Sequence, residues 1–500
     1  MAKHLLIDDR FVAETSGLTR RFHQARKCDR NPVIRADRPW EKDAAFVDSA
    51  MVVHDEAAGR FRAWYQGGAC YGPDDGSNMC YATSADGIEW HKPSLGLVDF
   101  EGSTDNNIVL AATCMMHDPA PIIDPADPDP RRRYKAVWWG GRRDAAQEGG
   151  WLLGHCVGFS ADGIRWQEHP DNPVWVGDAE VAVPFGLERT GGRLVMYSSA
   201  DGYGMRVTAR SESDDFVRWD LPPAPVFVPD DDDPPGTEAA GLAATDYAGT
   251  HIGMLWVARN LPEPGREEWR RIVERNRRQG FFGPPIEMNN VRCREMHTEL
   301  VVSRDGSRWD RIHREPLIPL GPEGSWDETL LLAARPLVHG DEIWLYYTGY
   351  GRATPTPGAT QLQRIQPWNI ETGLATLRLD GFASLSAEGA GVLVTEPFTA
   401  EGPAIAVNAD VRGSLRVEVL DEEGRPVPGL SREQAQPIAG DHLRAWAAWS
   451  SGSDLDSVRG RTIRLKVYVE RGDLYSVSIV ENRAPAGVRA PRPGTTRLSP

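Results

Sequence analysis

Carboxylates recur at one place in a repeated pattern of this 500-residue chain, and they are the residues best suited to chemistry. A segment rich in aromatic and branched residues occurs five times, and one or two acids stand shortly before each copy. Acids make up 72 of the 500 residues, so one match is common, but five favour a shared role. The acids are Asp48, Asp118, Asp178 with Glu180, Glu238, and Asp327 with Glu328.

Carboxylates that face one another can divide acid and base work. Each raises the pKa of the other, so that one stays protonated as an acid while another is an anion. Cleavage of a glycosidic bond needs this pair of roles. The alternative is structural, with each acid capping a turn or pairing with a nearby arginine.

The repeated segments predict β-strands that would position these acids. They are RFRAWYQG at 60–67, RYKAVWWGG at 133–141, RLVMYSS at 193–199, HIGMLWV at 251–257 and EIWLYYTG at 342–349. Four are followed by phrases like Ser-x-Asp-Gly-x-x-Trp, which begin at Ser84, Ser160, Ser211 and Ser303 and end at Trp90, Trp166, Trp219 and Trp309. A fifth, degraded copy is Leu379-Asp380-Gly381-Phe382. Asp-Gly between apolar runs predicts a hairpin, because both turn positions favour positive φ.

Five such units, each with room for about four short strands, predict an all-β chain with a five-bladed β-propeller over residues 1–390. The innermost strand of each blade lines the central channel, which would place the acids at one channel mouth. A β-sandwich of unrelated hairpins is the alternative for this region.

Near residue 390 the pattern changes. Apolar or alternating segments at 391–398, 404–411, 415–421, 462–469 and 475–481 lack the Asp-Gly-x-x-Trp phrase. They predict a C-terminal β-sandwich at 391–483, followed by a tail at 484–500. Residues 263–283 predict a helix within an arginine-rich insertion near 263–296. That insertion is either a solvated or oligomer-contacting segment, or a lid that carries arginines toward an anionic group of the substrate.

Composition excludes several function classes. The net charge of −16 argues against a nucleic-acid partner. No apolar run reaches the roughly 20 residues of a membrane helix, and the first residues do not form a secretory signal, so we expect no membrane partner and a cytoplasmic location. The six cysteines include no C-x-x-C pair, which argues against a zinc or redox motif.

Several phrases resemble the five-bladed glycosidases of glycoside hydrolase families 32, 43 and 68, above all the bacterial proteins described as family 32-like. They are LLIDD at 5–9, GLTR at 17–20, NPV at 31–33, RPWE at 38–41 and GLATLRLDGF at 373–382. Their order along residues 1–390 is more specific than any single phrase.

The resemblance implies a glycoside hydrolase that acts on a furanoside or short oligosaccharide with three acids. It implies Asp48 as nucleophile or base, Asp118 as the group that stabilises the transition state, and Glu180 as the proton donor. Asp48 matches by position only. His117-Asp118-Pro119 resembles the family's Arg-Asp-Pro with histidine in place of arginine, and Val181 stands where a cysteine follows the acid.

Further residues are candidates for binding the carbohydrate substrate through carboxylates or aromatic rings: Glu41, Asp178, Glu238, Asp327, Glu328, Trp40, Trp64 and Trp139. For each tryptophan the alternative is packing between blades. Arg206 and Arg210 are interpreted as ion-pair partners of acids, and His54 and His297 as pocket groups or structural histidines.

We expect no cofactor and no catalytic metal, although a structural Ca²⁺ could bind the acid ring or the run Asp230–Asp233. Two other functions stay open: a glycoside phosphorylase or transglycosylase on the same scaffold, and a non-catalytic carbohydrate-binding propeller. The sequence also leaves a homo-oligomer open.

Overall fold

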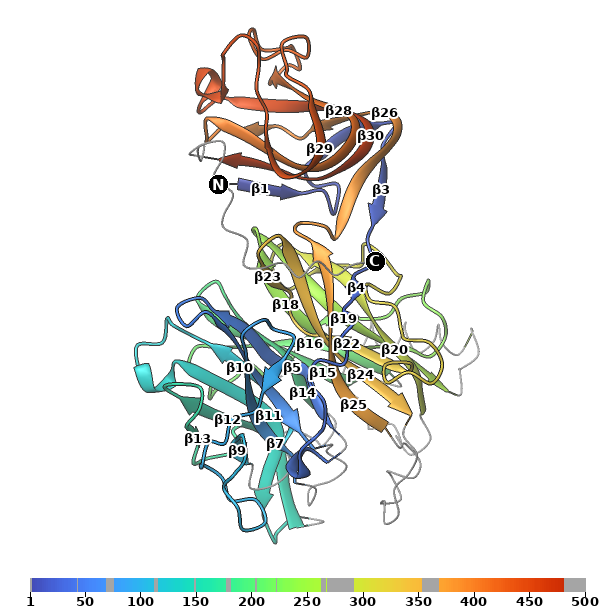
Figure 1. The fold of residues 1–500 in the computed structure, drawn as a ribbon. Helices are drawn as coiled ribbons and strands as arrows, with labels where there is room; N and C mark the ends of the chain where they lie inside the picture. Colours follow the sequence, from blue (N-terminus) through green and yellow to red (C-terminus); the bar gives the residue numbers. More distant parts are fainter. Residues whose placement is uncertain are drawn as a thin grey trace. The chain divides into compact units, whose positions relative to one another are not determined.

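A computed structural model of the chain describes residues 2–42, 44–68, 76–111, 116–147, 150–176, 181–202, 205–221, 223–261, 292–352 and 368–480, and the single residue Glu267. The described chain consists of β-strands joined by turns, with short 3-10 helices η1 (Pro39–Glu41), η2 (Pro130–Arg132) and η5 (Leu455–Val458), so the predicted all-β class is confirmed (Figure 1). Within these residues, no helix has the length and apolar character needed to cross a membrane.

The chain divides into two compact units. Unit 1 comprises Met1–Gln24, Val338–Ile343 and Leu377–Pro500. Unit 2 comprises Ala25–Leu337 and Trp344–Thr376.

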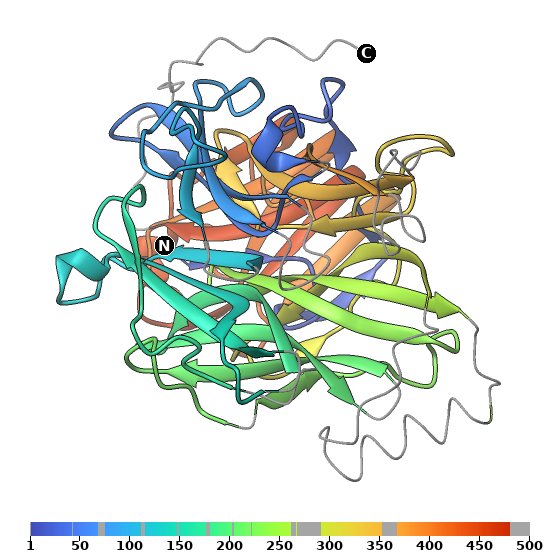
Figure 2. The same ribbon diagram turned by 90° about the horizontal axis from the view of Figure 1, so that it is seen from below.

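Three antiparallel sheets of unit 2 follow one another along the chain. The first has the order β5 (Ala45–Asp55), β6 (Arg60–Gly67), β7 (Asn78–Ser84) and β8 (Trp90–His91), with β9 (Ile108–Ala111) paired to β7. The second has the order β10 (His117–Ile123), β11 (Tyr134–Arg143), β12 (Trp151–Ser160) and β13 (Trp166–Glu168). The third has the order β14 (Val181–Thr190), β15 (Arg193–Gly202), β16 (Met205–Ser213) and β17 (Ala224–Phe227). Figure 2 shows the second sheet, in teal, beside the third, in green.

The remaining strands of unit 2 form a nine-stranded sheet that consists of two antiparallel groups. One group is β18 (Thr237–Tyr247), β19 (Thr250–Leu261), β20 (Arg292–Ser303) and β21 (Trp309–Asp310). The other is β22 (Leu330–Ala333), β24 (Glu342–Arg352), β25 (Trp368–Arg378) and β4 (Arg26–Lys27), with β23 (Leu337–His339) paired to β24. The two groups join through a single parallel pair, Met296 with Leu330.

All five repeated segments are therefore strands, and each is the second strand of its group: β6, β11, β15, β19 and β24. The predicted acids stand at or before the first strand of each group. First strands of consecutive sheets, such as β5 with β10 and β10 with β14, lie against one another.

The Ser-x-Asp-Gly phrase folds into a turn that side chains hold together. Asp86 Oδ1 accepts the backbone N–H groups of the second and third residues after it, at 2.9 and 2.8 Å. Ser84 Oγ accepts the N–H of Gly87 at 2.8 Å, and Trp90 Nε1 donates to the Gly87 carbonyl oxygen at 3.1 Å. The copies that end at Trp166 and Trp309 repeat this pattern.

Only the glycine of each central pair has positive φ, +73° at Gly87 and +77° at Gly163. The turn therefore differs from the hairpin turn predicted from Asp-Gly, which needs positive φ at both positions. The aspartate instead mimics a backbone turn with its carboxylate, as Asp side chains commonly do in loops.

The loose copy before Trp219 is shifted from its predicted register. Ser213, and not Ser211, supplies the hydroxyl, because its Oγ accepts the N–H of Phe216 at 2.8 Å. Asp215 Oδ1 accepts the backbone N–H groups of Val217 and Arg218 at 2.9 and 2.7 Å. Phe216 takes the glycine position with a φ of +67°, so the side-chain bonds hold a conformation that phenylalanine seldom adopts.

The fifth copy, Leu379-Asp380-Gly381-Phe382, was a wrong prediction. Its turn lies in unit 1, and the positive φ, +61°, belongs to Asp380 rather than to a glycine. The buried Asp380 carboxylate pairs with Lys3 Nζ and Ser476 Oγ, each at 2.7 Å, across the unit 1 sheet. The Asp-Gly pair alone does not specify the turn, because the upstream serine that caps it is missing here.

Aromatic side chains from a neighbouring sheet bind three of the four turns. Each donates a hydrogen bond to the carbonyl oxygen of the turn glycine: Tyr346 to Gly87 (2.8 Å), Trp64 to Gly163 (2.5 Å) and Tyr197 to Gly306 (2.8 Å). At two further boundaries between groups, Arg132 donates to the Asp215 carbonyl oxygen, and Trp256 Nε1 donates to that of Ala333 at 3.0 Å. These bonds connect the five groups of strands in chain order, and Tyr346 connects the last group to the first.

Unit 1 contains one antiparallel eight-stranded sheet around an aliphatic core that includes Leu393, Leu415 and Val467. Its main order is β2 (Val12–Ser16), β26 (Ala383–Thr395), β30 (Thr462–Val480), β28 (Ala404–Asp421) and β29 (Ile438–Trp446). At its sides, β1 (Ala2–Leu5) and β27 (Phe398–Thr399) pair with β30, and β3 (Thr19–Phe22) pairs with β26. Figure 1 shows the long strands of this sheet curving strongly.

Segments that were predicted as separate strands are continuous in this sheet. Residues 404–411 and 415–421 form β28, while 462–469 and most of 475–481 form β30. The pairing of β28 with β30 shifts between Val411 and Ser414, where a Cβ on Gly413 would lie 2.3 Å from the Glu470 carbonyl oxygen. Glycine therefore permits a close approach of two backbones and a bend without ending the strand.

The division into units differs from the predicted boundaries of 1–390 and 391–483. Residues up to Gln24 belong to unit 1, because β1 pairs with β30 and β2 and β3 pair with β26. Pairing between opposite ends of the chain leaves no local sequence signal. The helix predicted at 263–283 and most of the insertion near 263–296 lie outside the described residues, as does the tail at 484–500.

Replacing Gly163 with alanine should destabilise unit 2 by about 2–4 kcal/mol. The new Cβ would lie 2.6 Å from Cζ2 of the buried Trp64, at a backbone φ of +77°. Gly249 is the matched control, because its φ is +75° and a Cβ there would meet nothing within 4 Å. Urea unfolding of the full chain measures both losses, and equal losses would show that packing against Trp64 is unimportant.

Candidate active site

Asp118 is the second residue of β10, the first strand of the second sheet, and it has an uncommon conformation. Its φ is +49°, in the left-handed region that non-glycine residues seldom adopt. The pairing of β10 with β11 shifts between His117 and Ala120, so Asp118 lies in an irregular stretch. Its N–H donates to Gln66 Oε1 of the first sheet at 2.8 Å, which holds the strained backbone. Such strain is typical of functional residues.

The imidazole of His117 lies against the Asp118 carboxylate, with Nδ1 2.6 Å from Oδ2. The Asp118 side chain is only 5% exposed and that of His117 is 36% exposed, so the histidine is the group of the pair that solvent and ligands reach. Burial lowers the pKa of His117, but the attraction and hydrogen bond of Asp118 outweigh it, and the pKa lies above its ordinary value.

Glu238, near the start of β18, is buried and contacts Arg206 of β16. Its carboxylate accepts the Arg206 backbone N–H at 3.2 Å and lies 3.8 Å from Arg206 Nε. The positive charge of Arg206 also acts on His117 and lowers the pKa of that imidazole. Arg206 therefore couples the His117–Asp118 pair to Glu238.

These four residues come from three different sheets and provide two carboxylates, one guanidinium and one imidazole. Arg206 links them, because it contacts Glu238 and its charge acts on His117. The two carboxylates have different partners, an imidazole for Asp118 and a guanidinium for Glu238. Such a set can bind sugar hydroxyl groups and stabilise positive charge on a reacting carbon.

Three predicted acids cannot be compared with this geometry. Asp178 and Glu180 lie outside the described residues, directly before β14. Asp48 lies in β5, between Phe46 and Met51 where the pairing with β6 shifts, but its side chain is outside the description. The proposed nucleophile and proton donor therefore stay predictions.

Asp327 and Glu328 have internal contacts. Asp327 Oδ2 lies 2.5 Å from Lys27 Nζ and accepts the Tyr347 hydroxyl at 3.1 Å, and its Oδ1 accepts the Ser325 hydroxyl at 3.0 Å. Glu328 accepts the backbone N–H of Gly324 at 2.6 Å. Both carboxylates thus help to hold the segment before β22.

Glu41 is fully buried and has structural partners on every side. One oxygen accepts the backbone N–H groups of Asp37 and Arg38, each at 3.0 Å, and the other accepts the Tyr65 hydroxyl at 2.5 Å. Lys92 Nζ lies 2.7 Å away and balances its charge. These contacts are those of a carboxylate that stabilises the fold.

The three candidate tryptophans also have packing contacts. Trp64 is fully buried and donates to Gly163, and Trp40 donates to Asn107 Oδ1 at 2.7 Å beside Phe100. Trp139 is the cross-strand partner of His117, and its ring meets His155 edge-on at 5.5 Å between centroids. Trp139 is therefore the one of the three closest in register to Asp118.

The two arginines pair with acids, as predicted: Arg206 with Glu238, and Arg210 with Glu212. His297 has a structural partner, since its Nε2 lies 3.0 Å from Glu299 Oε1. His54 packs on Phe61.

The Asp230–Asp233 run is occupied by arginines. Arg314 pairs with Asp230 at 2.6 Å and with Asp233 at 3.0 Å, and Arg311 also pairs with Asp233. Over the described ranges, three or more His, Cys, Asp or Glu side chains nowhere gather as they would around a metal ion.

Sequence reasoning missed Gln66. Its contact with Asp118 crosses from one sheet to the next, and glutamine at the end of a predicted strand carries no signal of such a role.

No protein-family model matches the chain, and no curated protein matches it. Solved structures similar to it include a protein described as a glycoside hydrolase, with a TM-score of 0.45 and 14% identity over 71% of this chain and 92% of the other. A Bombyx mori GH32 β-fructofuranosidase has a TM-score of 0.39 and 12% identity over 93% and 95% of the two chains.

An N-acetylgalactosamine deacetylase from F. plautii, solved in complex with blood group B trisaccharide, has a TM-score of 0.46 and 14% identity over 73% of this chain and 97% of the other. The similar structures thus include glycoside hydrolases, the class that the sequence resemblance named, and an enzyme of different chemistry.

Replacing His117 with glutamine should make stability less dependent on pH. The raised pKa means that the protonated ring stabilises the fold, fully below the unfolded value of about 6.5 and progressively less as pH rises through the folded value. The difference in unfolding free energy between the wild-type chain and H117Q should therefore be largest near about pH 6 and shrink toward about pH 8.5. Urea unfolding across this range measures it, and a difference that grows with pH would contradict the ion pair.

Replacing Arg206 with glutamine should raise the pKa of His117 further, because the Arg206 charge lowers it. NMR titration of labelled histidine measures this pKa. Arg210→Gln is the control, since Arg210 lies on the same strand but pairs with Glu212. An unchanged pKa in R206Q would show that Arg206 does not couple to His117.

Proposed function

We propose that the chain is a glycoside hydrolase that cleaves a glycosidic bond of a furanoside or short oligosaccharide. The observation that carries the proposal is the set Asp118, His117, Arg206 and Glu238, in which a strained, buried acid lies against an imidazole, and Arg206, which lowers the pKa of that imidazole, pairs with a second acid from another sheet. Acids that converge from separate strands, each with its own charge partner, suit the stabilisation of an oxocarbenium-like transition state.

The proposal includes a five-bladed β-propeller for unit 2, whose blades are the five groups of strands. Support comes from the bonds that connect consecutive groups and return from the last to the first. Besides Tyr346, the last group donates from Thr372 Oγ1 to the Ala45 carbonyl oxygen at 3.0 Å, and Thr348 Oγ1 accepts the N–H of Val47 at 3.2 Å. A closed ring places the first strands, and hence the acids, around one channel.

For unit 1 we propose a β-sandwich made by one sheet that folds over its own core. The length of β28 and β30, their glycine-permitted bends and the buried aliphatic residues on their inner faces support this arrangement. Two layers of inward-facing side chains are the usual core of a sandwich.

In the proposed mechanism three carboxyl groups act together. Glu180 gives its proton to the leaving oxygen as the bond to the anomeric carbon breaks. Asp48 attacks that carbon or removes a proton from the attacking water, while Asp118 binds the ring hydroxyls and stabilises the developing positive charge. Where Asp48 acts as the nucleophile, water that Glu180 then deprotonates breaks the glycosyl–Asp48 bond and releases the sugar. Glu238, held by Arg206, would accept a further substrate hydroxyl.

The variants D48N, D118N and E180Q test these roles. On a furanoside or oligosaccharide that the wild-type chain hydrolyses, found with a panel of aryl furanosides and aryl pyranosides, each should lower kcat/KM by about 10²–10⁴-fold. Glu89→Gln is the control, because this surface acid is 71% exposed and lies at a turn. Full turnover by all three variants would exclude the assignment.

The same assay separates hydrolysis from phosphorolysis. Hydrolytic turnover should be unchanged when inorganic phosphate is added, and the product should be the free sugar. Turnover that requires phosphate and yields a sugar phosphate would replace the proposed reaction with that of a phosphorylase.

A further inference from the structure

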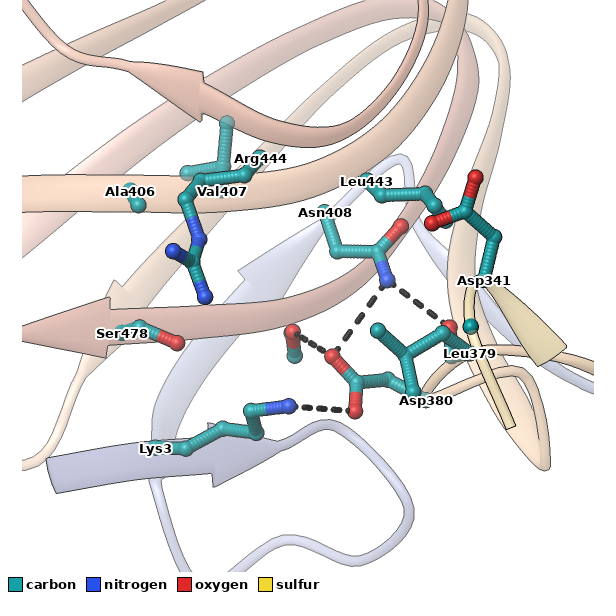
Figure 3. A pocket seen from close by; sticks show the side chains of 12 residues that line it. Lys3, Asp341, Leu379, Asp380, Ala406, Val407, Asn408, Leu443, Arg444 and Ser478 are labelled. Atoms are coloured by element: carbon teal, nitrogen blue, oxygen red, sulfur yellow. Dashed lines mark hydrogen bonds and ion pairs between the residues drawn. The ribbon is translucent and has the colours of Figure 1, made fainter. Parts of the chain in front are cut away.

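Unit 1 contains a polar cavity of about 320 Å³, whereas Asp118 and Glu238 belong to unit 2 (Figure 3). Its lining comes from β1, β28, β29, β30, the turn between β23 and β24 and the turn between β25 and β26. The volume lies at the lower end of the range of about 300–1,000 Å³ that is typical of small-molecule sites.

One wall of the cavity is fixed by the buried Asp380. Its carboxylate binds Lys3 Nζ and Ser476 Oγ, each at 2.7 Å, and accepts from Asn408 Nδ2 at 3.3 Å. Asn408 also donates to the Leu379 carbonyl oxygen at 2.8 Å. These bonds give a rigid polar wall in which the charge of Lys3 is already balanced.

Two other groups at the cavity lack such partners. Among the residues that the structure describes, Arg444 has no acid or hydrogen-bond acceptor for its guanidinium, and the Ser478 hydroxyl has no hydrogen-bond partner. Ser478 is only 8% exposed, so its hydroxyl has little access to water except through the cavity. Figure 3 shows the Arg444 guanidinium reaching down toward Ser478 and Lys3.

The charges around the cavity favour an anion on this side. Lys3 and Asp380 cancel each other, which leaves the guanidinium of Arg444 uncompensated beside a free hydroxyl donor. The other acid of the lining, Asp341, lies on the opposite side of the view from Arg444 (Figure 3). A guanidinium with neighbouring N–H and O–H donors is the usual partner of a carboxylate or phosphate.

We propose that this cavity binds a small ligand through an oxyanion, a carboxylate or a phosphate, held by Arg444 and Ser478 with Lys3 beside them. The apolar side chains of Leu443 and Val407 would contact the rest of the ligand. This site is independent of the proposed glycosidase activity, so either proposal can fail without the other.

Isothermal titration of the full chain with inorganic phosphate, glucuronate and glucose tests the proposal. Phosphate or glucuronate should bind, and the stronger of the two identifies the source of the oxyanion, while glucose should bind more weakly than either. Added salt should weaken the binding because an exposed guanidinium is screened. Glucose binding as tight as glucuronate, or no binding of either anion, would overturn the proposal.

Variants locate the binding. R444Q should weaken it by about tenfold or more, and S478A by a smaller factor. Arg412→Gln is the matched control, because Arg412 is exposed on β28 of the same sheet and does not line the cavity. Equal weakening in R444Q and R412Q would show that general surface charge, and not this cavity, binds the anion. Unchanged urea unfolding in R444Q separates lost binding from lost folding.

Discussion

The hydrogen bond from an aromatic side chain to a turn glycine in the next sheet is the interaction on which unit 2 depends. Tyr346, Trp64 and Tyr197 each make it, and each is buried between sheets. The glycine has two functions here: it takes the positive φ of the turn and it leaves room for the ring. One contact therefore fixes the turn geometry within a sheet and the spacing between sheets. A small change at either partner would disturb both.

The candidate site follows from this spacing. Gln66 belongs to the same strand as Trp64, and it reaches across the boundary that Trp64 fixes to bind the strained backbone of Asp118. Arg206 and Glu238 meet across another boundary. These candidate groups thus lie where sheets adjoin, and their geometry depends on packing contacts more than on any one strand. A buried carboxylate in a left-handed conformation persists only in such a rigid frame.

Acids in this protein fall into two kinds by their partners. Glu41 and Asp327 each have a lysine and further donors, so their charge is used in holding loops. Asp118 has a half-exposed imidazole, and Glu238 has a single arginine that also acts on that imidazole. Residue type and spacing in the sequence are the same in both kinds. Glu41 and Asp327 can therefore be excluded as catalytic candidates only when their lysine partners are known.

The sequence by itself determined the strands, the repeat and the position of an acid before each first strand, since these follow from local alternation and from the Ser-x-Asp-Gly-x-x-Trp phrase. It also led to His117-Asp118 and to an arginine partner for the acids. Tertiary structure alone decided which of the described acids have a lysine partner, because Lys27 and Lys92 reach Asp327 and Glu41 from distant segments. It also placed the first 24 residues in unit 1 and gave Asp380 to the cavity wall. Pairing between segments far apart in the chain depends on the packing of whole sheets, and it leaves no trace in local residue patterns.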